Sequence, residues 1–180
     1  MFKNFLSYFN ENLDLTYSDN PFRDFVLQLG GKTFGNGLFR SFSKENLEAW
    51  TGNVNEAYPE FEGKFILFGY DWLGRCFGID LRKKSRGNVL MFEIGAAEIF
   101  EIPCSFLEFL NEEIPEYSDE CLAEEYFHQW TESSGKTLEY GRCAGYRIPL
   151  FLGGEDALDN LEDSDMDVYW SVLTQVKNTM

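Results

Sequence analysis

The chain has 180 residues, of which 44% are hydrophobic and 17% aromatic, and its formal net charge is −16 at pH 7. Its 18 phenylalanines supply ample apolar surface for a core, which argues against a disordered chain. No apolar run approaches the roughly 20 residues of a membrane span, and the N-terminus lacks the basic start and apolar core of a signal peptide. We therefore expect one cytoplasmic domain over residues 1–180, in which residues 1–30 form a short helical N-terminal extension.

The net charge lies in one half of the chain. Residues 1–90 contain 11 basic and 11 acidic side chains, whereas residues 91–180 contain 4 basic and 20 acidic ones. Such a field repels nucleic acid and anionic membranes, and it attracts basic proteins. The alternative is a solvated acidic surface that only aids solubility.

The first third of the chain predicts short helices and one hairpin. Apolar residues at helical spacing indicate helices over Phe2–Phe9 and Phe22–Leu29, the second ended by a pair of glycines. Asn36-Gly37 is a tight-turn signal with a short strand on either side. Ser43 is a suitable N-cap for a helix that extends to about Asn55.

Residues 64–103 form the centre of the predicted fold. Four apolar runs, separated by short breaks rich in glycine, asparagine and charge, indicate β-strands: Phe65–Tyr70, Cys76–Leu81, Val89–Ile94 and Ile99–Ile102. The breaks are too short for a crossover helix, so consecutive strands should pair antiparallel as a meander. The first and third runs are apolar throughout, which indicates strands covered on both faces.

After Pro103 the spacing of the apolar residues changes to that of helices. Ser105 and Glu108 have the spacing of a capping box, for a helix that Pro115 should end. Ser118 can cap a second helix with an acidic outer face and a buried stripe of Leu122, Tyr126, Phe127 and Trp130.

The C-terminal part alternates between apolar and acidic segments. Gly141–Leu152 is apolar and β-like, and an acidic loop over Glu155–Asp167 follows it. Asp165 or Asp167 should begin a last helix, whose apolar stripe is Tyr169, Val172, Leu173 and Val176. The whole pattern predicts an α+β fold: a central antiparallel sheet, made of the meander 64–103 plus flanking strands, packed by N- and C-terminal helices.

The residues that could carry catalysis have simpler interpretations. His128, the single histidine, lies beside the apolar stripe of a predicted helix, where a packed or rim residue is commoner than the base of a cysteine nucleophile. The four cysteines lack metal-ligand spacing and are read as buried or free thiols: Cys76, Cys104, Cys121 and Cys143. We therefore predict that the protein is not an enzyme.

The acidic loop resembles a calcium-binding loop only at its start. Asp163–Asp167 has the alternating acids of an EF-hand, but Val168 replaces the required glycine and Thr174 the required glutamate. An irregular cation site is the alternative at this loop. The sequence predicts no metal and no cofactor.

Two groups of loop residues indicate partner binding. Asp71, Trp72 and Arg75 lie at a predicted hairpin tip, and Trp and Arg are enriched at protein interfaces. The alternative is that Trp72 folds back on the sheet while Arg75 pairs with Asp71. The second group belongs to the acidic loop and comprises Glu155, Asp156, Asp159, Glu162, Asp163 and Asp165.

Several of these segments resemble one known family, the C-terminal domain of bacterial immunity proteins paired with type VI secretion DNase effectors. The resemblance extends over residues 30–176 and rests on four motifs: YDWLGR at Tyr70–Arg75, FEIGAAEIFEIPCSFLEFLN at Phe92–Asn111, GYRIPLFLGGEDALDNLE at Gly145–Glu162, and DVYW at Asp167–Trp170. A GAD-related segment often precedes this domain in the family, but residues 1–30 are too short to form one. The family is similar in style to the SUKH immunity superfamily.

This resemblance implies a role without catalysis. Such a protein would bind a cognate toxin, a basic effector with nuclease activity, and silence it by occluding or distorting its active site. The negative charge argues against a nucleic-acid or membrane partner. Two alternatives are a regulatory or protein-interaction module of the same fold, and an enzyme or ligand-binding domain with a pocket beside the sheet.

Overall fold

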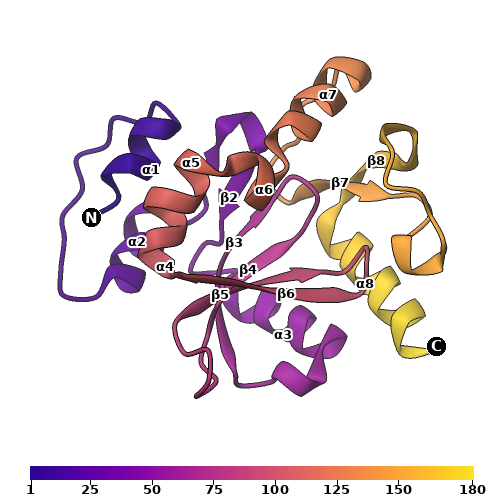
Figure 1. Cartoon of the computed structure of the whole chain (residues 1–180), viewed down its shortest axis with the longest axis horizontal. Coiled ribbons are helices and arrows are strands. Elements are labelled where there is room, and N and C mark those ends of the chain that lie inside the picture. Colours follow the sequence, from indigo (N-terminus) through magenta and orange to yellow (C-terminus); the bar gives the residue numbers. More distant parts are fainter.

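A six-stranded antiparallel sheet forms the centre of the computed structural model, which describes residues 1–180 (Figure 1). Each strand pairs with the next one along the chain, which confirms the predicted meander. The strands are β1 (Thr33–Phe34), β2 (Phe39–Ser41), β3 (Phe65–Asp71), β4 (Cys76–Asp80), β5 (Asn88–Glu93) and β6 (Glu98–Ser105). The hairpin predicted around Asn36 adds β1 and β2, and its turn places Asn36 and Gly37 at positive φ angles of 54° and 111°.

The remaining elements are helices and one separate pair of strands. The helices are α1 (Lys3–Tyr8), α2 (Pro21–Leu29), α3 (Leu47–Ala57), α4 (Phe106–Glu108), α5 (Ile114–Glu116), α6 (Ser118–Leu122), α7 (Glu124–Ser134) and α8 (Met166–Asn178). A π-helical turn, Phe109–Glu113, joins α4 to α5, and β7 (Arg142–Tyr146) pairs antiparallel with β8 (Leu161–Asp165). None of the helices is both long and apolar enough to cross a membrane.

The six-stranded sheet separates two apolar cores. On one face, α1, α2 and the helices from α4 to α7 pack through side chains such as Phe5, Phe25 and Phe109. On the other face, α3 and α8 pack through Trp50 and Trp170. Strands β3 and β5 supply buried side chains to both cores, which confirms the prediction made from their continuous apolar runs. Residues 1–30 form two helices, as predicted, and these helices cover part of the first face.

The turn between β3 and β4, residues 71–75, is buried where several segments meet. Trp72 has no exposed surface, and its indole Nε1 donates a hydrogen bond of 2.9 Å to the carbonyl of Leu122. The Trp72 carbonyl accepts from the backbone N–H of Ala144 at 2.7 Å. The backbone N–H of Trp72 donates to the Leu38 carbonyl. One tryptophan therefore connects the turn before β2 with α6 and β7.

A buried ion pair fixes the shape of the same turn. The Asp71 carboxylate accepts from Arg75 Nε at 2.6 Å and from the backbone N–H groups of Leu73 and Arg75. Arg75 Nη2 donates onward to the Cys121 carbonyl, and the Gly74 carbonyl accepts from the indole of Trp170. These bonds satisfy polar groups that would otherwise be costly to bury. We call residues 71–75 the anchoring turn.

Three predicted helix boundaries are wrong. The Ser43 hydroxyl accepts from the N–H of Asn46 within a turn, and α3 begins only at Leu47. Pro115 lies inside the continuous helical run Phe106–Glu116, which ends one residue past it at Glu116. The helix predicted from Ser118 onward breaks at Ala123, which adopts a φ of 53° and separates α6 from α7.

The anchoring turn makes a direct stability prediction. Replacing Trp72 by Ala removes a fully buried side chain, so we expect the free energy of unfolding to fall by about 3–5 kcal/mol in urea denaturation. Leu27→Ala is the control, because Leu27 is 57% exposed on α2 and should change stability by no more than about 0.5 kcal/mol. Equal, small effects of both substitutions would contradict the anchoring role.

Candidate partner-binding surface

The acidic segment predicted as a loop over Glu155–Asp167 is in part a strand. Its second half forms β8, in which Ala144 pairs with Asp163 and Gly145 with Glu162. Hydrophobic alternation could not reveal this strand, because its residues, LEDSD, contain one apolar side chain. What holds β8 in place is its pairing with the backbone of β7.

Two arginines neutralise part of this acidic segment. Arg142 on β7 forms an ion pair with Asp163, and Arg147 lies 3.3 Å from Glu162. The second pair is more than half exposed, so it contributes little to stability. Both arginines belong to the few basic residues in the second half of the chain.

Two other acids of the predicted set have structural roles. Asp165 is the N-cap of α8, where its carboxylate accepts from the N–H of Val168 at 3.0 Å, which confirms the predicted helix start. Asp156 accepts from the hydroxyl of Tyr146 at 2.8 Å, and burial together with this carboxylate raises the pKa of Tyr146. Glu155 and Asp159 are exposed, and neither carboxylate forms an ion pair.

Five of these six acids, all except Asp163, line three shallow hollows. The first lies between Asp156 and the acidic outer face of α6 and α7, where it is lined by Asp119 and Glu125. The second is lined by Arg147, Glu155 and Asp159. The third lies between β8 and α8, and Arg147 also lines its edge. We call the surface formed by Glu155, Asp156, Asp159, Glu162, Asp163 and Asp165 the acidic face.

The acidic face lies at one end of the protein. In Figure 1 the pair β7–β8 and the loop between them are at the right end of the longest axis, while α1 and α2 are at the left end. The acids that the sequence singled out in this segment are therefore gathered around one hairpin.

The other predicted group does not lie on the surface. Asp71 and Trp72 have no exposed surface, and Arg75 is 8% exposed. The expectation that they stand at an accessible hairpin tip is wrong, and the alternative holds: Trp72 folds into the core and Arg75 pairs with Asp71. The physical reason is that later segments of the chain, α6, β7 and α8, cover the turn.

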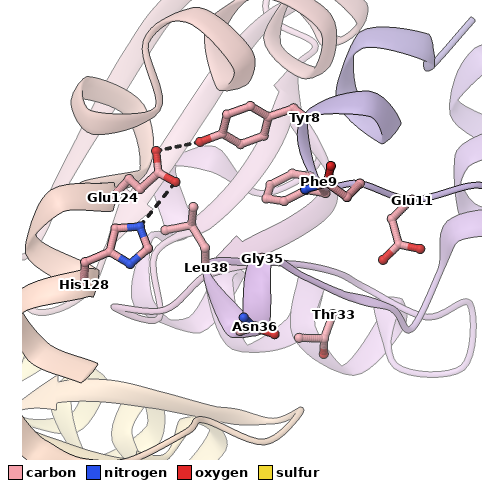
Figure 2. A pocket seen from close by; sticks show the side chains of 10 residues that line it. Tyr8, Phe9, Glu11, Thr33, Gly35, Asn36, Leu38, Glu124 and His128 are labelled. Atoms are coloured by element: carbon pink, nitrogen blue, oxygen red, sulfur yellow. Dashed lines mark hydrogen bonds and ion pairs between the residues drawn. The ribbon is translucent and has the colours of Figure 1, made fainter. Parts of the chain in front are cut away.

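The sequence did not reveal a polar cluster between α1 and α7. Figure 2 shows Tyr8, Glu124 and His128 around a hollow of about 410 Å³, beside the turn at Gly35 and Asn36. The Glu124 carboxylate accepts from the Tyr8 hydroxyl at 2.6 Å and lies 3.6 Å from the His128 ring. Tyr8 and Glu124 are 116 residues apart, so no local pattern could have paired them.

The Glu124 carboxylate of this cluster is bonded to other parts of the fold. Partial burial of Glu124 opposes its ionisation, but hydrogen bonds from Ser118 and Tyr8 and the nearby His128 outweigh it and lower the pKa of Glu124. Burial and the same carboxylate raise the pKa of Tyr8 to about 12. The cluster therefore joins α1, α6 and α7 through charge-assisted hydrogen bonds.

The burial and the pKa values of the cysteines are the opposite of those of a nucleophilic cysteine. All four are buried, and burial raises the pKa of Cys104 and that of Cys121 to about 12 each. Reactive cysteines instead have lowered pKa values and partial exposure. No group of three or more His, Cys, Asp or Glu side chains converges as metal ligands.

Comparison with known proteins finds a family match in the C-terminal part of the chain. Residues 104–177 match the family model described as "T6SS immunity protein Tdi1, C-terminal". The matched model is that of the type VI secretion immunity family that the sequence motifs resemble, and the match covers less than half of the chain. The matched residues run from the end of β6 to α8 and contain the whole acidic face.

The fold has a counterpart among solved structures. The crystal structure of Atu4351 from Agrobacterium tumefaciens superposes with a TM-score of 0.64 over 97% of this chain and 89% of that one. The two sequences are 15% identical, so the likeness shows a shared fold. No curated protein sequence matches this chain.

The lowered pKa of Glu124 predicts a dependence of stability on pH. A carboxylate with a lowered folded-state pKa stabilises the protein above its unfolded pKa of about 4.3, and this contribution is lost as the pH falls through the folded value. Glu124→Gln should lower the unfolding free energy at pH 7 by about 1 kcal/mol, and the difference from wild type should shrink towards pH 3.5.

Urea denaturation at several pH values measures this effect. Glu125→Gln is the matched control, because Glu125 is exposed on the same helix and accepts no hydrogen bond from Tyr8 or Ser118. It should change stability by no more than about 0.5 kcal/mol. A Glu124→Gln difference that is constant from pH 7 to pH 3.5 would contradict the assignment.

Proposed function

We propose that this protein is a bacterial immunity protein that binds a type VI secretion effector, a basic nuclease, and blocks its activity in the cytoplasm. The observation that carries the proposal is the family match over residues 104–177, which contains the acidic face. The proposed role is binding without catalysis.

The charge of the acidic face supports a basic partner. Residues 91–180 contain 20 acids and 4 basic residues, and two of these four, Arg142 and Arg147, are already paired with Asp163 and Glu162. A third, Lys177, donates to the carbonyl of Ala57. The segment therefore keeps a large excess of negative charge for a partner.

A nuclease offers the matching surface. An enzyme that holds DNA neutralises phosphates with Lys and Arg, so its substrate-binding surface is positively charged. A protein with an acidic face can occupy such a surface and exclude the substrate. Complementary charges also accelerate association, to as much as about 10⁸–10⁹ M⁻¹s⁻¹ at low salt, which suits an inhibitor that must act before the toxin does.

The first test of this proposal reverses charge at Glu155 and Asp159. Glu155→Lys with Asp159→Lys should slow association with the toxin encoded beside the gene about tenfold at low salt, and less as salt rises, because exposed charges steer the encounter. Both side chains are exposed and without an ion pair, so the fold should be unaffected. Asp163 is unsuitable, because its reversal would break the pair with Arg142.

The control reverses the same amount of charge at the other end of the protein. Asp14→Lys with Asp19→Lys changes two exposed acids in the segment between α1 and α2, and the association rate should stay within about twofold of wild type. Surface plasmon resonance gives the rates, and co-expression with the toxin gives protection. Failure of the wild-type protein to bind or protect would contradict the proposed function, and equal slowing by both variants would contradict the placement of the interface.

A further inference from the structure

Helix α8 carries apolar side chains that the fold does not bury. The stripe predicted for its core includes Val172, but Val172 is 50% exposed, and Val168, one turn earlier, is 59% exposed. Trp170, which the predicted stripe omitted, fills the core in their place and has no exposed surface. Two valines spaced four residues apart therefore form an apolar strip on the outside of the helix.

These valines form one wall of the third hollow, between β8 and α8. Its apolar lining is completed by Tyr146, Tyr169 and Leu173, and its volume is about 280 Å³. Small-molecule sites commonly enclose about 300–1,000 Å³, so this hollow is at or below their lower limit. Its size suits one or two side chains of a protein partner.

The floor of the hollow is fixed before any partner arrives. The Tyr169 hydroxyl accepts from the N–H of Tyr146 at 3.3 Å. Gly145 lies against the Tyr169 ring and Gly95 against its hydroxyl, so closely that a Cβ atom at either glycine would come within 2.7 Å. A rigid floor loses little conformational entropy on binding, which favours affinity.

The rim of the hollow is acidic. Glu162 and Asp165 line it beside Ser164. Arg147, which pairs with Glu162, lines it too, so acids outnumber the basic side chain by two to one. An apolar centre inside a charged, solvated rim is the usual arrangement of protein interfaces. A second copy of this chain fits poorly, because it would bring two acidic rims together. A basic surface fits both the apolar centre and the rim.

We propose that this hollow is the centre of the effector interface, and that it receives an apolar side chain carried on the basic surface of the effector. This inference rests on the proposed function and adds the residues that determine how long the complex lasts. The acidic rim accelerates association, whereas Val168 and Val172 retain the bound partner by burial of apolar surface.

The test separates these two contributions by kinetics. Val168→Gln with Val172→Gln changes no charge and places a better helix former at each exposed position. We expect the dissociation rate of the toxin complex to rise about tenfold or more, while the association rate stays within about twofold of wild type. Leu27→Gln is the matched control, because Leu27 is 57% exposed on α2, and it should leave both rates unchanged.

The outcomes distinguish this inference from the proposed function. Wild-type binding with an unchanged dissociation rate in the valine variant would overturn the inference and leave the immunity role intact. Absence of wild-type binding would overturn both. Urea denaturation checks that the variant is folded, and if it is not, Val168→Thr with Val172→Thr, which preserves side-chain shape, must show the same rise in dissociation rate.

Discussion

The hydrogen bonds and burial of the anchoring turn, residues 71–75, determine how the two halves of the chain fit together. Trp72 forms hydrogen bonds with Leu122 and Ala144, and Gly74 forms one with Trp170. One turn of the central sheet is therefore hydrogen-bonded to α6, β7 and α8. The Asp71–Arg75 pair is buried inside it. Backbone N–H groups that donate to Asp71 and the Cys121 carbonyl that accepts from Arg75 Nη2 offset part of the cost of burying these two charges.

In this arrangement, the side chains that support the fold differ from those proposed to recognise a partner. Within the motifs that resemble the immunity family, the buried Trp72 and Trp170 hold the fold together. The same motifs also carry exposed side chains, among them Glu155, Asp159 and Val168. The exposed acids and the two valines of α8 make few contacts within the chain. Under the proposed function, a partner would therefore be matched through the acidic face and the hollow between β8 and α8 while the supporting core stays unchanged.

Sequence patterns predicted most of the fold, because most of its elements are encoded locally. The four central strands and the capping box at Ser105 could be recognised from neighbouring residues alone. Burial of Trp72 could not, since it depends on contacts with residues at least 50 positions later. The strand β8 was missed because its acids mask any apolar alternation, and the exposure of Val172 was missed because spacing cannot tell which face of a helix finds a partner.

Hydrogen–deuterium exchange of the protein with and without the toxin encoded beside its gene tests the central claim most directly. The account predicts that bound toxin slows exchange in residues 146–172, which include the acidic face and the valine-lined hollow, while residues 1–30 exchange as in the free protein. The account would be contradicted if bound toxin slowed exchange only in the N-terminal helices or around the hollow beside His128, and left exchange in residues 146–172 unchanged.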